Sequence, residues 1–158
     1  MGDAETLFRL SGLNASYAAA IDADRLEDWP GFFLERCIYK VTTAENLARG
    51  YAAGIIFADN RAMLADRVVA LRGANIYERQ RYRHVVGMPV LGPTEDGVII
   101  AETSFVIVRT MRDGQMELFA AGVYRDRVRE DADGVLRFAE RIVVCDSQRF
   151  DTLVAIPL

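Results

Sequence analysis

Metal-binding side chains are scarce in this chain. Among its 158 residues there is a single histidine, His84, and two cysteines, Cys37 and Cys145, without C-x-x-C spacing. Neither a Cys₂His₂ iron–sulfur site nor a two-histidine-one-carboxylate iron site can be made from so few donors. The phosphate-binding and nucleophile motifs G-x-G-x-x-G, the P-loop and G-x-S-x-G are also absent. The sequence therefore predicts no metal, no cofactor and no standard catalytic motif in this chain.

Lysine and long apolar runs are scarce as well. Lys40 is the only lysine, and the net charge of −4 with a pI near 5.1 argues against a general nucleic-acid binder. Apolar runs stay well short of the ~18 residues of a membrane span, and no signal-peptide pattern is visible. With 51% hydrophobic and 27% charged residues, the chain suits one globular domain over 1–158. We expect a cytoplasmic protein that binds neither nucleic acid nor membrane.

Hydrophobic periodicity predicts helices first and strands later. Helical spacing covers residues 3–24 and 61–72, with strands expected at 37–42 and 54–57 and a polar connection over 45–53. Three Asp-Gly pairs then divide the remaining chain into long β-rich segments; this dipeptide favours tight turns because it tolerates positive φ. The turns begin at Asp96, Asp113 and Asp133. The order predicts an α+β fold, with N-terminal helices packed on a curved, mainly antiparallel sheet.

The stretch 74–90 carries most of the unusual chemistry. At strand spacing, Tyr82, His84, Val86, Met88 and Val90 share one face, while Arg81 and Arg83 occupy the other. A second arginine stripe follows at Arg125, Arg127 and Arg129. One interpretation is a solvated edge that deters strand pairing; the other is a surface that docks onto carboxylates of another chain. The repetition favours docking, with subunit-interface candidates Tyr77, Arg79, Arg81, Arg83, Arg125 and Arg127.

A general acid–base site is the alternative use of the histidine. His84, Glu102, Tyr124 and Glu140 could face one cavity if the strand registers brought them together. The simpler interpretation, which we favour, is that these groups satisfy one another or the backbone inside the fold. The apolar end, DTLVAIPL, must likewise lie against its own domain or a neighbour.

Several segments together resemble a known family. They are EDWPGFFLERCIYKVTT, NRAMLADRVVALRGANIYERQRYRHVVGMPV, FAAGVYRDRVRE and LRFAERIVVCDS. In this order they resemble the small (β) subunits of aromatic-ring-hydroxylating, Rieske non-heme iron dioxygenases. ANIYERQRYRH and the ending AIPL are most similar to terephthalate-type members. The resemblance covers nearly the whole chain.

The resemblance implies a cone-shaped fold like that of nuclear transport factor 2. It also implies an α₃β₃ hexamer, in which the β subunits form a trimer with a structural, assembly role. The Rieske [2Fe-2S] cluster and the mononuclear iron would lie in the large α subunit, where O₂ and NAD(P)H-derived electrons act on a monocyclic aromatic acid. The family supplies no catalytic residue for this chain. Two alternatives stay open: a free-standing cyclase, isomerase or dehydratase using His84 with a carboxylate, and a small-molecule binding module.

Overall fold

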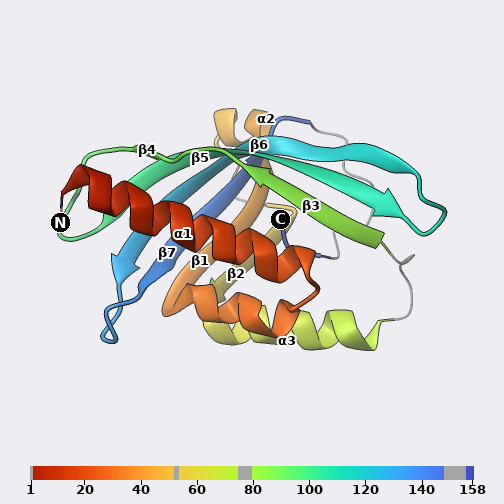
Figure 1. The fold of residues 1–158 in the computed structure, drawn as a ribbon, viewed down its shortest axis with the longest axis horizontal. Coiled ribbons are helices and arrows are strands. Elements are labelled where there is room, and N and C mark those ends of the chain that lie inside the picture. The colour runs from red at the N-terminus through yellow and green to blue at the C-terminus, as the bar shows by residue number, and fades with distance from the viewer. Residues whose placement is uncertain (1, 52–53, 75–79, 148–155) are drawn as a thin grey trace.

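The computed structural model describes residues 2–51, 54–74, 80–147 and 156–158. Its helices come mostly early in the chain: α1 (Asp3–Asp22), the 3₁₀ helix η1 (Leu26–Phe32), α2 (Ala44–Ala48) and α3 (Arg61–Gly73). The strands are β1 (Phe33–Thr43), β2 (Ile56–Asn60), β3 (Gln80–Val86), β4 (Val90–Leu91), β5 (Ile99–Met111), β6 (Met116–Glu130) and β7 (Leu136–Cys145). Long β5, β6 and β7 span the molecule behind α1 (Figure 1).

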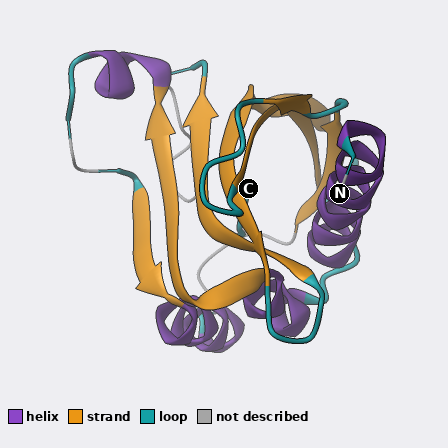
Figure 2. Ribbon diagram, turned by 90° about the vertical axis from the view of Figure 1, so that its left-hand side faces the viewer, coloured by secondary structure: helices purple, strands orange, loops and turns teal. Residues whose placement is uncertain are grey.

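All seven strands belong to one sheet with the order β2-β1-β7-β6-β5-β3, and β4 pairs with β5. Every pairing is antiparallel except β1 with β7, which is parallel. The sheet curves around an interior that α1 closes on one side (Figure 2). The predicted α+β cone with a curved, mainly antiparallel sheet is confirmed, and the parallel pair is an addition to it.

Local signals explain most element boundaries. The Asn60 side chain accepts a hydrogen bond from the Met63 backbone N–H at 2.9 Å and so begins α3. Gly97, Gly114 and Gly134 have φ of 74°, 90° and 79°, so all three Asp-Gly pairs form the expected turns.

Two predicted segments differ from the structure. The polar connection expected over 45–53 contains α2, because the Thr43 side chain accepts from the Asn46 backbone N–H and starts a helical turn. The strand alternation expected through Val90 ends at Val86, and Met88 and Val90 are exposed instead of sharing the buried face of Tyr82. The pairing of β3 with β5 ends at Val86, and β4 pairs with the same strand from Val90 onward.

The core lies between the inner face of the sheet and the helices α1, η1 and α3. Its centre is aromatic, with edge-to-face contacts joining Trp29, Phe33 and Tyr39 at 5.0–5.9 Å between ring centroids. Ile156 and Leu158 are buried in this same core. Within the apolar end, the described residues 156–158 therefore lie against their own domain, the first of the two expected alternatives.

The outer face of the sheet is different, because large apolar side chains remain exposed on it. They include Val85, Met88, Val90, Met116 and Leu118. Within the described residues the outer face therefore carries an uncovered apolar surface.

Candidate functional site

A buried arginine dominates the polar interior. Arg141 on β7 has no exposed surface, and its Nε and Nη2 donate to both oxygens of Asp126 at 2.8 and 2.7 Å. Nη2 also donates to Asn14 Oδ1 on α1. The guanidinium lies 3.9–4.4 Å from the ring centroids of three aromatic side chains, those of Phe138, Tyr124 and Tyr17. Through Asp126 and Asn14, Arg141 therefore links β7 to β6 and to α1.

Opposing effects set the protonation of this arginine. Burial lowers the pKa of Arg141, but the adjacent Asp126 carboxylate more than offsets this and holds the pKa above its ordinary value. Arg141 therefore stays charged and bidentately bound, which suits a structural centre and not a proton-transfer group.

The histidine is held by a residue that sequence reasoning missed. His84 Nδ1 lies 2.6 Å from Asp22 Oδ1, and the His84 backbone N–H donates to Asp22 Oδ2 at 2.9 Å. The His84 side chain is fully buried, and among the described residues its Nε2 has no hydrogen-bond partner. Asp22 is the last residue of α1, so the pair fastens that helix to β3.

The four residues of the predicted acid–base pocket do not come together. His84 faces inward, while Glu102 lies on the outer face of β5, 3.6 Å from Arg125. Tyr124 is in the core, stacked on Phe105 with 4.3 Å between ring centroids. Glu140 is partly exposed on β7, opposite Arg127 in the ladder. The grouping is corrected because alternation along β5 places Glu102 on the face opposite His84.

The predicted interface arginines do share a surface. Arg81 and Arg83 are exposed on the face of β3 opposite His84, as the alternation requires. Arg125 lies on the same outer face of the sheet, and Arg127 is 3.8 Å from Glu95. Tyr77 and Arg79 lie outside the described residues. We call the outer sheet surface with these four arginines and Val85, Met88 and Val90 between them the arginine face.

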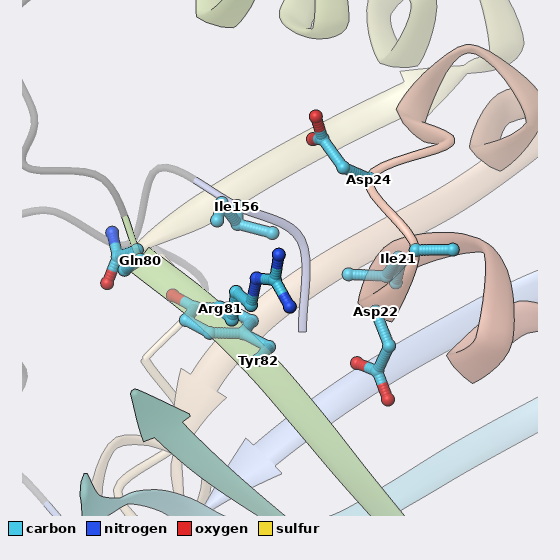
Figure 3. A pocket seen from close by; sticks show the side chains of 8 residues that line it. Ile21, Asp22, Asp24, Gln80, Arg81, Tyr82 and Ile156 are labelled. Carbon is cyan, nitrogen blue, oxygen red and sulfur yellow. The ribbon is translucent and has the colours of Figure 1, made fainter. Parts of the chain in front are cut away.

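A small pocket of about 320 Å³ opens between β3 and the end of α1 (Figure 3). Ile156 lies between the two elements, with Tyr82 on one side and Ile21 on the other. The Asp24 carboxylate at its edge is bound by Arg72 Nη1 at 2.9 Å. His84 is not among the residues that line this pocket.

The donors in this chain do not fit an iron centre. Among the described residues no three of His, Cys, Asp and Glu cluster as metal ligands would. Burial raises the pKa of Cys37 to about 11 and that of Cys145 to about 12, so both thiols stay protonated. Neither a Rieske cluster nor a mononuclear iron can be built from them.

The fold and these sites define a class. A curved sheet closed by helices, a buried arginine–carboxylate centre and an exposed arginine face describe an α+β domain with the cone fold. None of the described helices is long and apolar enough to cross a bilayer.

Comparisons with known proteins identify the family within this class. The family model described as ring hydroxylating beta subunit matches residues 17–152. The β1 subunit of the terminal oxygenase component of terephthalate 1,2-dioxygenase from Comamonas sp. is 48% identical over 95% of this chain and 97% of its own. The small subunit of anthranilate 1,2-dioxygenase from Burkholderia cepacia is 40% identical over 99% of this chain and 96% of its own.

A solved structure agrees with these relatives. The protein from Novosphingobium aromaticivorans assigned as the beta subunit of an aromatic-ring-hydroxylating dioxygenase superposes with a TM-score of 0.89. It is 37% identical, and the match covers 97% of each chain. The chain belongs to the family of ring-hydroxylating dioxygenase beta subunits, and its partner is therefore the large, alpha subunit.

Proposed function

We propose that this chain is the assembly subunit of a cytoplasmic oxygenase that acts on a monocyclic aromatic acid resembling terephthalate. The 48% identity to a terephthalate 1,2-dioxygenase subunit, over nearly the whole of both chains, carries the substrate class. We place the Rieske [2Fe-2S] cluster and the mononuclear iron in the large subunit, because the donors of this chain fit neither. All 158 residues form one domain in this proposal.

The proposed assembly is an α₃β₃ hexamer built around a trimer of this chain. The arginine face supports it, since exposed guanidinium groups beside an uncovered apolar surface suit a protein partner with carboxylates. Among the described residues, Arg125 and Arg127 make only long, half-exposed contacts with Glu102 and Glu95. Such pairs contribute little to the isolated chain, so the arginines can exchange these partners for others at small cost.

Co-expression with the large subunit tests the proposal. We expect a complex of hexameric mass in size-exclusion chromatography with light scattering, carrying iron and oxidising terephthalate in the presence of its reductase. The small chain purified alone should contain no stoichiometric iron. Iron bound by the isolated chain, or failure of the two chains to associate, would contradict the assignment.

The Asp22–His84 pair favours one second candidate, an acid–base enzyme of the same cone fold. A carboxylate orienting a histidine is an arrangement used in general base catalysis. In the assembled, iron-loaded oxygenase, we expect His84→Ala to change turnover by no more than a few fold. A catalytic histidine would be worth about 10²–10⁴ in rate. A loss of that size would replace the assembly role with a catalytic one.

A further inference from the structure

A hollow of about 450 Å³ opens on the outer face of the sheet, where β3 gives way to β4. Its walls are the apolar side chains of Met88, Val90, Ile100 and Val123. Ser104, a small residue, lies among them and leaves the space between them open. We call this hollow the outer pocket. It lies within the arginine face, on the side of the sheet away from the core.

An interruption at the edge of the sheet creates the outer pocket. The ladder of β3 with β5 stops several residues before β4 begins. Between the two strands, the Gly87 backbone N–H donates to the Ser104 backbone oxygen at 2.9 Å. Beyond β4, the Gly92 backbone N–H donates to the Ile100 backbone oxygen at 2.8 Å. These bonds hold the segment against β5 at both ends, so the pocket is formed before a partner arrives, which lowers the entropic cost of binding.

The walls of the outer pocket are highly exposed for apolar side chains. Met88 is 74% exposed and Val90 is 71% exposed. Apolar surface of this kind gains free energy when another molecule covers it. An exposed apolar patch with a hollow at its centre and a polar rim is typical of a place where a protein partner inserts a side chain.

Charged groups on β6 border the outer pocket. In the ladder of β5 with β6, Ile100 lies opposite Arg127, and Glu102 lies opposite Arg125. Arg125 Nε lies 3.6 Å from Glu102 Oε1, and both side chains are about half exposed. A partner that brings its own carboxylate beside an apolar side chain can form a closer pair with these arginines. The pocket and its rim therefore fit an apolar residue that lies beside an aspartate or glutamate on the partner's surface.

The large subunit suits this face better than a second copy of the chain does. Two copies that met through this face about a two-fold axis would bring their arginine stripes together, and like charges pressed together oppose association. Each copy would contribute Arg81, Arg83, Arg125 and Arg127. The chain belongs to the family of β subunits, whose partner is the large subunit.

We propose that the outer pocket is the anchor site of the interface with the large subunit, which inserts one bulky apolar side chain and presents a carboxylate to Arg125 or Arg127. The inference rests on the assembly function proposed above, and it names the group on the partner that this face recognises. A few buried anchor residues usually dominate the energy of a protein interface. The outer pocket is where this chain receives such an anchor.

Filling the outer pocket tests the proposal. Ser104→Phe places an aromatic ring in the space, and Val90→Asp puts a charge on its wall. Each should weaken association with the large subunit by about 30-fold or more, the usual effect of losing an interface anchor. Sedimentation of the large subunit titrated with each small chain measures the affinity. Thermal unfolding should show that both isolated variants stay folded, because both positions are exposed.

Two matched controls separate the pocket from general effects of substitution. Ser104→Ala leaves the space empty and should associate as the wild-type chain does. Val69→Asp makes the same change as Val90→Asp at a residue that is 72% exposed. It lies on α3, far from β4, and should also associate normally (Figure 1).

A photo-crosslinker identifies the occupant, even if a pocket substitution disturbs folding. With p-benzoylphenylalanine in place of the exposed Met88, irradiation of the co-expressed complex should join the small chain to the large subunit. A crosslink to a second copy of this chain instead would overturn the proposal. Tight association of both Ser104→Phe and Val90→Asp would remove the anchor site and leave the assembly role standing. A wild-type chain that does not bind the large subunit would contradict both.

Discussion

Arginine has two different roles in the two halves of this molecule. Inside the cone, Arg141 is fully buried, and a carboxylate meets it at 2.7–2.8 Å. On the arginine face, Arg125 and Arg127 are about half exposed, and their nearest carboxylates in the described part of the chain lie at 3.6 and 3.8 Å. Water cannot reach the buried ion pair to replace its hydrogen bonds, so this pair contributes to the stability of the fold. Outer pairs compete with water and leave the guanidinium groups available to another chain.

Breaking the interior pair should give the largest effect. Asp126→Ala leaves Arg141 charged and buried without its carboxylate, which typically costs about 3–5 kcal/mol of folding stability. Urea unfolding of the isolated chain measures the loss. Glu102→Ala removes the outer partner of Arg125 and serves as the control, with an expected change within about 0.5 kcal/mol. Equal urea midpoints for the two variants would contradict the expectation that the interior pair contributes more to stability than the surface pair.

Reversing a charge on the arginine face should affect assembly and spare the fold. For Arg83→Glu and Arg125→Glu we expect association with the large subunit to weaken by about 2–5 kcal/mol, the cost of breaking a buried interfacial pair. The isolated chain should keep its stability within about 0.5 kcal/mol. Analytical ultracentrifugation of mixed subunits measures the first, and thermal unfolding the second.

The control is Arg25→Glu, which reverses an exposed arginine between α1 and η1, away from the sheet. It should assemble normally. Full assembly of both arginine-face variants would leave that surface without a role in docking.

The interior is also tight at the level of its backbone. A Cβ added at Gly122 on β6 would lie 1.9 Å from the Val144 carbonyl oxygen on β7. Gly122→Ala should therefore separate the two strands at a cost of about 1–3 kcal/mol. Gly12→Ala on α1, where a Cβ meets nothing within 4 Å, should instead stabilise the chain by about 0.4–1 kcal/mol. Chemical denaturation of both variants checks the opposite signs.

The surface ion pairs between arginine and carboxylate should make folding stability depend weakly on pH in the acidic range. Hydrogen bonds from Arg137 lower the pKa of Asp133 to about 2, and those from Arg72 lower that of Glu27 to about 2. Since the unfolded pKa values are higher, this stability is present above about pH 4 and is lost as the pH falls toward 2. Carboxyl titration by NMR should give both values, and Arg137→Ala should return Asp133 to its ordinary range. A value for Asp133 that stays near 2 without Arg137 would contradict this cause.

Local features were predictable from the sequence, and distant pairings were not. The three Asp-Gly turns and the opposite facing of Arg83 and His84 depend on a few neighbouring residues, so the sequence pattern contained them. The Asn14–Arg141 contact joins residues 127 apart. The sequence shows that both are polar but not that they meet.

Strand alternation and a register shift together explain why the acid–base grouping failed. Glu102 faces outward by the alternation of β5, and the ladder of β6 with β7 shifts between Arg127 and Val128, beside the Arg127–Glu140 pair. Each such shift changes which residues of neighbouring strands face each other, so counting alternate positions along one strand cannot align residues on several strands. Asp22, the true partner of His84, lies on a helix end, where no strand alternation could indicate it.

The place of β7 in the sheet has a consequence for synthesis. This late strand lies between β6 and β1, and its parallel pairing with β1 joins residues about a hundred positions apart. During translation, one edge of β1 therefore stays unpaired until β7 has been synthesised. Such long-range closure slows folding and leaves strand edges exposed meanwhile. The nascent chain should remain sensitive to protease and to chaperone binding until residues 136–145 have left the ribosome.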